Sequence, residues 1–198
     1  MPKEDDVHHV KRIVERSSIE AITGTAALAL VDAPKVLRDR GGWKIPKTPA
    51  LRVVEGALID RLVLGVMRLH DPKRRMYSLC KAMPQIRDQS MRAALLASPE
   101  QGEECDKAVA LWDALTQDPC FERVKQFRHS VIAHPGEPPA DRAGYADVQA
   151  CAVSTFEVAA RLAQSMGLAR YPFIEAERLS AREAKEFWRK HATEMPRP

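Results

Sequence analysis

An arginine and a histidine six residues apart are the side chains of this sequence best suited to chemistry. They are Arg128 and His134, in the segment PCFERVKQFRHSVIAHPGEPP at positions 119–139. An imidazole can move the proton of a ribose 2′-hydroxyl, and a guanidinium matches the charge that grows on phosphate oxygens. The two groups together suit phosphodiester transesterification.

The apolar residues around this pair predict how a helix would present it. A helix that begins at Pro119 places Arg128 inside an apolar stripe, so its guanidinium is expected in the core or in an interface. Pro135 disfavours helical geometry at the residue before it, so the helix is expected to end at or just before His134. His129 is expected to point to the other side. The stripe consists of Cys120, Phe121, Val124, Phe127, Val131 and Ile132.

Both candidate residues also have structural explanations that the spacing leaves open. His134 could cap the C-terminal end of its helix and interact with the last carbonyls. Arg128 could pair with a carboxylate of the core, because a buried cation is costly unless it is paired.

The rest of the chain predicts an all-α fold. Apolar residues recur at spacings of three and four, and no stretch alternates with a period of two. We therefore expect one domain over 1–198, an irregular antiparallel helical bundle with extra helices at its N- and C-terminal ends. A capping side chain followed by proline predicts four helix starts: Thr48-Pro49, Asp71-Pro72, Ser98-Pro99 and Asp118-Pro119.

The other helix boundaries are predicted from prolines and glycines that interrupt helices and from capping side chains. We expect a first helix from Glu4 to about Val31, a loop over 33–47, and a helical stretch over 76–96 that Pro84 interrupts. A long helix should cover 142–166 and end at Gly167. Ser180 and Glu183 form a capping box for the last helix, with Phe187 and Trp188 on one face. The tail, 193–198, is expected to fray.

Composition narrows the classes of protein. The chain has 198 residues and a formal net charge of +4, which permits a nucleic-acid partner without requiring one. No apolar run is long enough for a membrane span, and the acidic start MPKEDDVHHV is unlike a signal peptide. We expect a cytoplasmic protein without a membrane partner.

The sequence contains no motif that indicates a cofactor or a metal site. It contains no glycine-rich phosphate loop, no HExxH and no nucleophile elbow. Four scattered cysteines are expected to be small buried residues, neither disulfide-bonded nor zinc-bound: Cys80, Cys105, Cys120 and Cys151. We therefore expect no cofactor and no metal site.

The segment FRHSVIAHPGEP resembles the motif of the HEPN superfamily, an arginine followed after four to six residues by a histidine near a helix end. Within the superfamily it looks most like the AbiU2-like abortive-infection group. The likeness covers about twenty residues and includes an aromatic residue before Arg128, the polar His129 after it, the pair Ala133-His134, and Glu137 in a short loop.

The resemblance implies a metal-independent endoribonuclease, a toxin or phage-defence effector that cuts tRNA or mRNA. It implies a homodimer in which two motif helices face each other, with Arg128 holding the scissile phosphate and His134 as general base. The partner copy's histidine would act as general acid, and His129 would orient the site. An antitoxin or regulatory protein is a further possible partner.

Two positions depart from the family pattern. Gly136 stands where HEPN toxins with nucleotidyltransferase antitoxins often have tyrosine, so control by nucleotidylation of that residue is not expected. His129 replaces the more familiar asparagine or aspartate. The rival hypothesis is a catalytically silent helical module that uses the same face for dimerisation or for binding a nucleotide or a protein partner.

Overall fold

The computed structural model describes residues 2–41, 43–72, 77–133, 143–168 and 173–194. Helices make up nearly all of these ranges, which confirms the all-α fold. None of the described helices is long and apolar enough to cross a lipid bilayer. The elements in chain order are α1 (Glu4–Gly41), β1 (Trp43–Lys44), α2 (Pro49–His70), α3 (Leu79–Arg87), α4 (Gln89–Leu95), α5 (Pro99–Gln117), α6 (Pro119–Phe127), the π-helical segment η1 (Arg128–Ala133), α7 (Tyr145–Ser165), α8 (Phe173–Arg189) and β2 (Thr193–Glu194).

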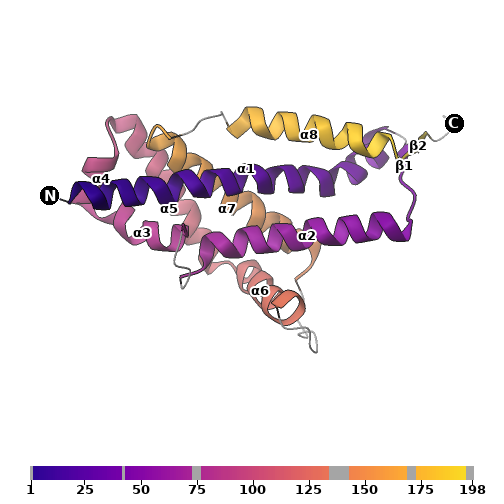
Figure 1. Ribbon diagram of the computed structural model, residues 1–198, viewed down its shortest axis with the longest axis horizontal. Coiled ribbons are helices and arrows are strands. Elements are labelled where there is room, and N and C mark those ends of the chain that lie inside the picture. The colour runs from indigo at the N-terminus through magenta and orange to yellow at the C-terminus, as the bar shows by residue number, and fades with distance from the viewer. Residues whose placement is uncertain (1, 42, 73–76, 134–142, 169–172, 195–198) are drawn as a thin grey trace.

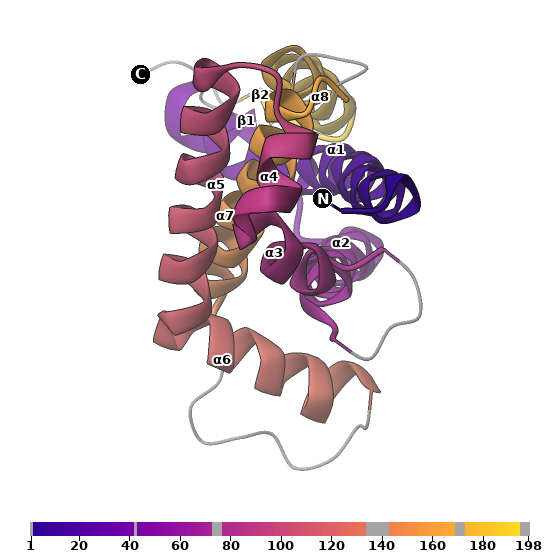
Figure 2. The ribbon, with the colours of Figure 1, turned by 90° about the vertical axis from the view of Figure 1, so that its left-hand side faces the viewer.

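The long helices lie side by side. α1 packs against α2, α7 and α8, and α5 packs against α7. In Figure 1, α8 lies on the upper side of α1, and α6 projects below α2. Figure 2 shows α6 running across the bottom of the bundle, on the side away from α8. The helix that leads to Arg128 thus lies across the long helices, on one side of the bundle.

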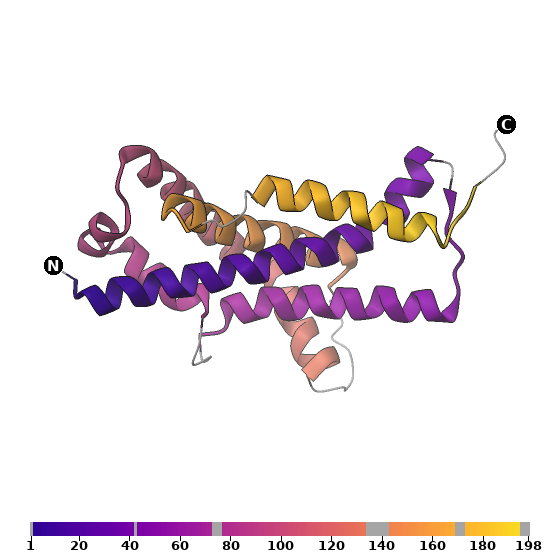
Figure 3. The same cartoon turned by 45° about the horizontal axis from the view of Figure 1, so that its top comes forward.

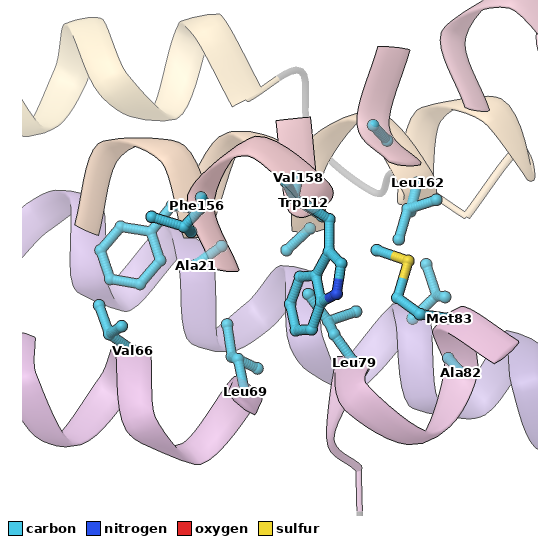
Figure 4. Packing of buried hydrophobic residues seen from close by; sticks show 14 of the residues in the cluster. Ala21, Val66, Leu69, Leu79, Ala82, Met83, Trp112, Phe156, Val158 and Leu162 are labelled. Carbon is cyan, nitrogen blue, oxygen red and sulfur yellow. The ribbon is translucent and has the colours of Figure 1, made fainter. Parts of the chain in front are cut away.

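The core has a large and a small part. The larger cluster joins α1, α2, α3, α5 and α7 through fully buried side chains such as Leu79, Met83, Phe156 and Leu162. Figure 4 shows Trp112 and Leu69 among them. The smaller cluster lies between the C-terminal halves of α1 and α8 and consists of Ala33, Leu37, Ala184 and Trp188, with Trp43 packed against it.

The first helix continues ten residues beyond the predicted end at Val31 and includes Pro34. A proline inside a helix removes the N–H donor for the carbonyl four residues earlier, here that of Leu30. The indole Nε1 of Trp188 donates to that carbonyl at 2.6 Å. The loop predicted over 33–47 was therefore wrong up to Gly41, because a residue of α8 replaces the missing donor.

Three of the four predicted helix starts are confirmed. The side chains of Thr48, Ser98 and Asp118 accept hydrogen bonds from first-turn N–H groups, and a proline follows each. The fourth start was wrong, because Pro72 lies outside any helix and α3 begins at Leu79.

The break predicted at Pro84 lies elsewhere. Pro84 sits inside α3, and the interruption comes at Asp88, which ends α3 and caps α4 by accepting from the Met91 N–H at 2.8 Å. Pro84 is the sixth residue of α3, where it removes the N–H that would donate to the Cys80 carbonyl.

The long helix α7 ends as predicted. Gly167 has φ +66, a left-handed conformation that glycine adopts at no steric cost. Its N–H donates to the Gln164 carbonyl at 3.1 Å, and the Leu168 N–H donates to the Ala163 carbonyl at 2.8 Å. These two bonds form a Schellman closure.

The last helix differs from the prediction. It begins at Phe173, so Ser180 and Glu183 lie inside a helix and form no start. Trp188 is fully buried whereas Phe187 is 38% exposed, so they do not share a face. Thr193 and Glu194 pair antiparallel with Lys44 and Trp43, which corrects the expected fraying of these two residues. The remaining tail, 195–198, lies outside the described residues.

Candidate functional site

The predicted motif helix is continuous but changes type at the candidate arginine. α6 runs from Pro119 to Phe127, and Arg128, with φ −55 and ψ −44, continues it into η1, which ends at Ala133. The predicted end at or just before His134 is not tested, because the described part of this segment stops at Ala133. π-Helical turns have i→i+5 hydrogen bonds and occur frequently at functional sites. Because the turn is wider, the α-helical angle predicted between Arg128 and the residues after it does not apply.

One face of α6 is buried, as the apolar stripe predicts. Cys120 and Val124 are buried, and the half-buried rings of Phe121 and Phe127 pack against the large core cluster. The helix contacts α2, α5 and α7 (Figure 2). This packing fixes the direction in which α6 presents Arg128.

A buried histidine at the end of α2 packs against α6. His70, the last residue of α2, stacks on Trp112 with ring centroids 4.0 Å apart and contacts the Phe121 ring at 4.5 Å. Its Nε2 lies 3.1 Å from the Thr155 hydroxyl oxygen. Burial lowers the pKa of His70 to about 3, so its imidazole is neutral at physiological pH. His70 is therefore a packing residue and not an acid–base group.

Two thiols join α6 to α7. The Sγ atoms of Cys120 and Cys151 lie 3.3 Å apart, and both side chains are buried. Burial raises the pKa of each thiol, which keeps both protonated and weakly nucleophilic. Cys105 is also buried, as predicted, whereas Cys80 is half-buried.

An ion pair ties α6 to the start of α7. Arg123 donates to Asp147 at 2.5 Å, and the second carboxylate oxygen of Asp147 accepts from the Gly144 N–H at 2.8 Å. The Arg123 guanidinium, together with the Gly144 bond, holds the pKa of Asp147 below its usual range. The ion pair thereby holds α6 against the start of α7.

A second contact holds the start of α7 against α1. Both carboxylate oxygens of Asp32 accept hydrogen bonds, one from the Tyr145 hydroxyl at 2.7 Å and one from the Gln149 amide at 2.9 Å. Burial, followed by the hydrogen bond to Asp32, raises the pKa of Tyr145. Tyr145 therefore stays protonated and acts as a donor.

Arg128 is half-buried at the junction of α6 and η1. Its Nε is buried and has no hydrogen-bond partner among the described residues. No carboxylate in the described part of the chain forms an ion pair with it. Pairing with a core carboxylate, the structural alternative, is thus not found within that part.

The other predicted residues divide between described and undescribed positions. His129 is exposed, which agrees with its predicted direction away from the stripe. His134, Gly136 and Glu137 lie outside the described residues, so the structure does not test their placement. Among the described residues no group of three or more His, Cys, Asp or Glu side chains could hold a metal ion.

The sequence analysis missed three residues that position the site. His70 lies four residues after Val66 and seven after Val63, so helical spacing alone marks it as inward-facing. Arg123 and Asp147 are 24 residues apart, and no local pattern pairs them.

Comparison with known proteins gives one family. The family model HEPN_AbiU2, described as AbiU2, matches residues 11–187, a range that contains α2 to α7 and both Arg128 and His134. No curated protein and no solved structure matches the chain.

Proposed function

Because this chain belongs to the AbiU2 family of the HEPN superfamily, we propose that it is a metal-independent endoribonuclease. Membership makes the chain a HEPN-type abortive-infection module. Its proposed role is that of a cytoplasmic toxin or phage-defence effector, and its proposed substrate is tRNA or mRNA.

The state of Arg128 is the observation that supports the proposal. Its guanidinium always carries a charge, and its Nε is desolvated without a partner among the described residues. A buried donor without an acceptor costs about 1–3 kcal/mol. A phosphate oxygen supplied by a substrate would satisfy this donor and match the charge of the guanidinium. If Arg128 had only a structural role, the unsatisfied Nε would lower stability without any benefit.

The proposed mechanism divides the work between two kinds of side chain. Arg128 holds the scissile phosphate and stabilises the charge on its oxygens, and His134 takes the proton of the 2′-hydroxyl. The 2′-oxygen then bonds to phosphorus, and the bond to the 5′-oxygen breaks. The partner copy's histidine protonates the leaving oxygen, and His129 orients the site. The products carry a 2′,3′-cyclic phosphate and a 5′-hydroxyl.

The proposed catalytic unit is a homodimer. A two-fold axis beside α6 would bring two Arg128 and two His134 side chains together, because a two-fold interface uses the same surface on both subunits. Neighbouring guanidinium groups would lower the pKa of the imidazoles and favour the neutral form that accepts a proton.

Cleavage of RNA in excess EDTA tests the proposal. Total tRNA and a defined single-stranded RNA are incubated with the wild type, Arg128→Ala and His134→Ala, and the product ends are analysed. We expect cyclic-phosphate ends from the wild type and a loss of at least about 100-fold in either variant, since a positioned proton-transfer group contributes about 10²–10⁴-fold and a donor to the developing charge about 10²–10³-fold.

Lys125→Ala is the matched control. Lys125 is an exposed cation on the same helix, 3.1 Å from Glu122, so removing it changes charge but not the proposed site. We expect its activity to stay close to that of the wild type. Equal cutting by all four proteins would overturn the assignment of Arg128 and His134, and a folded dimer that cuts no RNA would favour the binding-module hypothesis.

A further inference from the structure

Two thiols lie side by side where α6 meets α7, eight residues before Arg128 in the chain. The Sγ atom of Cys120, the second residue of α6, lies 3.3 Å from the Sγ atom of Cys151, the seventh residue of α7. Both are free thiols. A disulfide bond is about 2.0 Å long, so the two sulfurs would have to approach each other by about 1.3 Å to form one.

The surrounding contacts already hold these two thiols in place. The Cys120 N–H donates to the carboxylate of Asp118 at 2.7 Å, which fixes the first turn of α6. In the next turn, Arg123 donates at 2.5 Å to Asp147 of α7, four residues before Cys151. Two cysteines can be bridged without movement of the backbone only when their side chains point toward each other. Here they do so between two helices that an ion pair joins beside them.

The position of α6 in the bundle makes this junction important. α6 projects below α2, on the side away from α8 (Figures 1 and 3). The thiol contact and the ion pair join its first two turns to α7. A covalent bond at Cys120 would therefore strengthen the attachment of the helix that leads to Arg128.

The exposure of the two thiols differs and assigns their roles. Cys120 is 8% exposed, whereas Cys151 is 0% exposed. So narrow an opening admits hydrogen peroxide, which is little larger than water, more readily than a bulky oxidant. Burial raises the pKa of both thiols, and the thiolate is the form that attacks, so the reaction is expected to be slow. Cys120 is the thiol that the oxidant reaches, and Cys151 is the thiol that completes the bond.

We propose that Cys120 and Cys151 are a site of reversible oxidation, at which hydrogen peroxide joins α6 to α7 through a disulfide bond. The Cys120 sulfur attacks one peroxide oxygen and becomes a sulfenic acid, and the other oxygen leaves as water. The Cys151 sulfur then attacks the Cys120 sulfur, the S–S bond forms, and a second water leaves. Each sulfur loses one electron, and the peroxide is reduced to two waters. A thiol reductant reverses the reaction by exchange.

The disulfide would close a loop of the chain that contains both Arg128 and His134. Closing a loop restricts the unfolded state, so oxidation should raise the temperature at which the protein unfolds. The reaction uses neither Arg128 nor His134. It therefore goes beyond the proposed ribonuclease activity and does not depend on it.

Peptide mapping of the full-length protein tests the proposal. The reduced wild type is treated with excess hydrogen peroxide, the remaining thiols are alkylated, and the non-reduced digest is analysed by mass spectrometry. We expect a peptide pair joined through Cys120 and Cys151, lighter by two hydrogen atoms than the two free peptides together, which dithiothreitol separates again. The oxidised protein should unfold at least about 4 °C above the reduced protein.

Single variants identify the two sulfurs. Cys120→Ala and Cys151→Ala should each abolish the crosslink and the rise in unfolding temperature, with an unchanged circular dichroism spectrum. Cys80→Ala is the matched control, because Cys80 is half-buried on α3 and thus more exposed than Cys120. It should keep both the crosslink and the rise, since proximity of the two sulfurs, and not exposure, decides the product.

Three results would overturn the proposal. The first is the absence of the crosslink under conditions that oxidise Cys80, which would make Cys120 and Cys151 packing residues only. The second is a bond from Cys120 to Cys80, or between two chains, in place of the expected pair. The third is an oxidised protein that unfolds at or below the temperature of the reduced one, which would mean that the bond forms only after α6 has left α7. None of these measurements uses RNA, so this proposal and the ribonuclease proposal fail separately.

Discussion

Two basic side chains next to α6 show two different responses to burial. His70 loses its charge, since burial lowers its pKa to about 3, and its ring is covered by Trp112 and Phe121. Arg128 cannot lose its charge, yet its Nε is buried without a described partner. The first is an ordinary core residue, and the second keeps an unsatisfied donor. This difference is the reason to propose Arg128, and not His70, as the residue that binds the phosphate.

The low pKa of His70 predicts how stability changes with pH. The unfolded chain binds a proton on this histidine below about pH 6.5, whereas the folded chain does not until about pH 3. The unfolded state therefore binds more protons in this window, so the free energy of unfolding decreases as the pH is lowered, by up to about 1.4 kcal/mol per unit. Urea unfolding should show His70→Gln losing about 2 kcal/mol less than the wild type between pH 7.5 and 5.

An exposed histidine provides the comparison for that measurement. His9 is exposed on α1, so His9→Gln should keep the wild-type dependence of stability on pH. Identical slopes in the wild type and His70→Gln would show that the imidazole of His70 can bind a proton in the folded protein.

Sequence spacing predicted the partial burial of Arg128 but not the residues that support α6. The apolar stripe around Arg128 predicted its partial burial, since that depends only on neighbours within α6. His70 was missed, because its environment comes from Trp112, Phe121 and Thr155, which belong to three other helices. Helical spacing gives the direction of a side chain, but not what it meets.

At the scale of the helices, local signals were right where a cap decided the boundary. Thr48, Ser98 and Asp118 cap helices at the predicted positions, because a cap needs only the next few residues. Pro34 was misjudged, since the carbonyl it leaves without a donor is satisfied by Trp188, 158 residues from Leu30. The helix that continues past Pro34 gives α8 the surface on which it packs, through Ala33 and Leu37.

Two glycines inside long helices give opposite predictions for α1 and α2. A Cβ at Gly24 would overlap the buried ring of Phe156, whereas one at Gly56 would have no neighbour within 4 Å. Gly24→Ala should lower the free energy of unfolding by about 1–3 kcal/mol, because the packed ring has little room to move. Gly56→Ala should raise it by about 0.5–1 kcal/mol, since alanine favours a helix over glycine. Thermal and urea unfolding measure both.

Each glycine variant is the control for the other, since both gain the same helix propensity. A stabilised Gly24→Ala would mean that α1 and α7 are not as close at Phe156 as the structure places them. A destabilised Gly56→Ala would mean that the exposed face of α2 is covered in solution.

At the scale of the whole molecule, α6 and α8 lie on opposite sides of the bundle (Figures 1 and 2). The proposed dimer would therefore meet through α6 and leave α8 on its outer sides. Asp147 accepts hydrogen bonds from Arg123 and from the Gly144 N–H, and these bonds hold α6 against the start of α7. A dimer through α6 would therefore join two surfaces that are already fixed within each subunit. The proposed active site is then shared, and one subunit alone lacks half of it.

A shared site predicts that a wild-type subunit loses its cleavage activity when it pairs with an inactive subunit. The wild type is mixed with an equal amount of the double variant Arg128→Ala/His134→Ala, and subunits are allowed to exchange before cleavage is measured. Random pairing leaves about a quarter of the dimers fully wild-type, so activity per wild-type chain should fall by about half. Lys125→Ala keeps Arg128 and His134, so its mixture with the wild type should keep the full activity per chain with an intact site. Full activity per wild-type chain in the mixture with the double variant would mean that one subunit suffices, and a group of the same chain would then have to protonate the leaving oxygen.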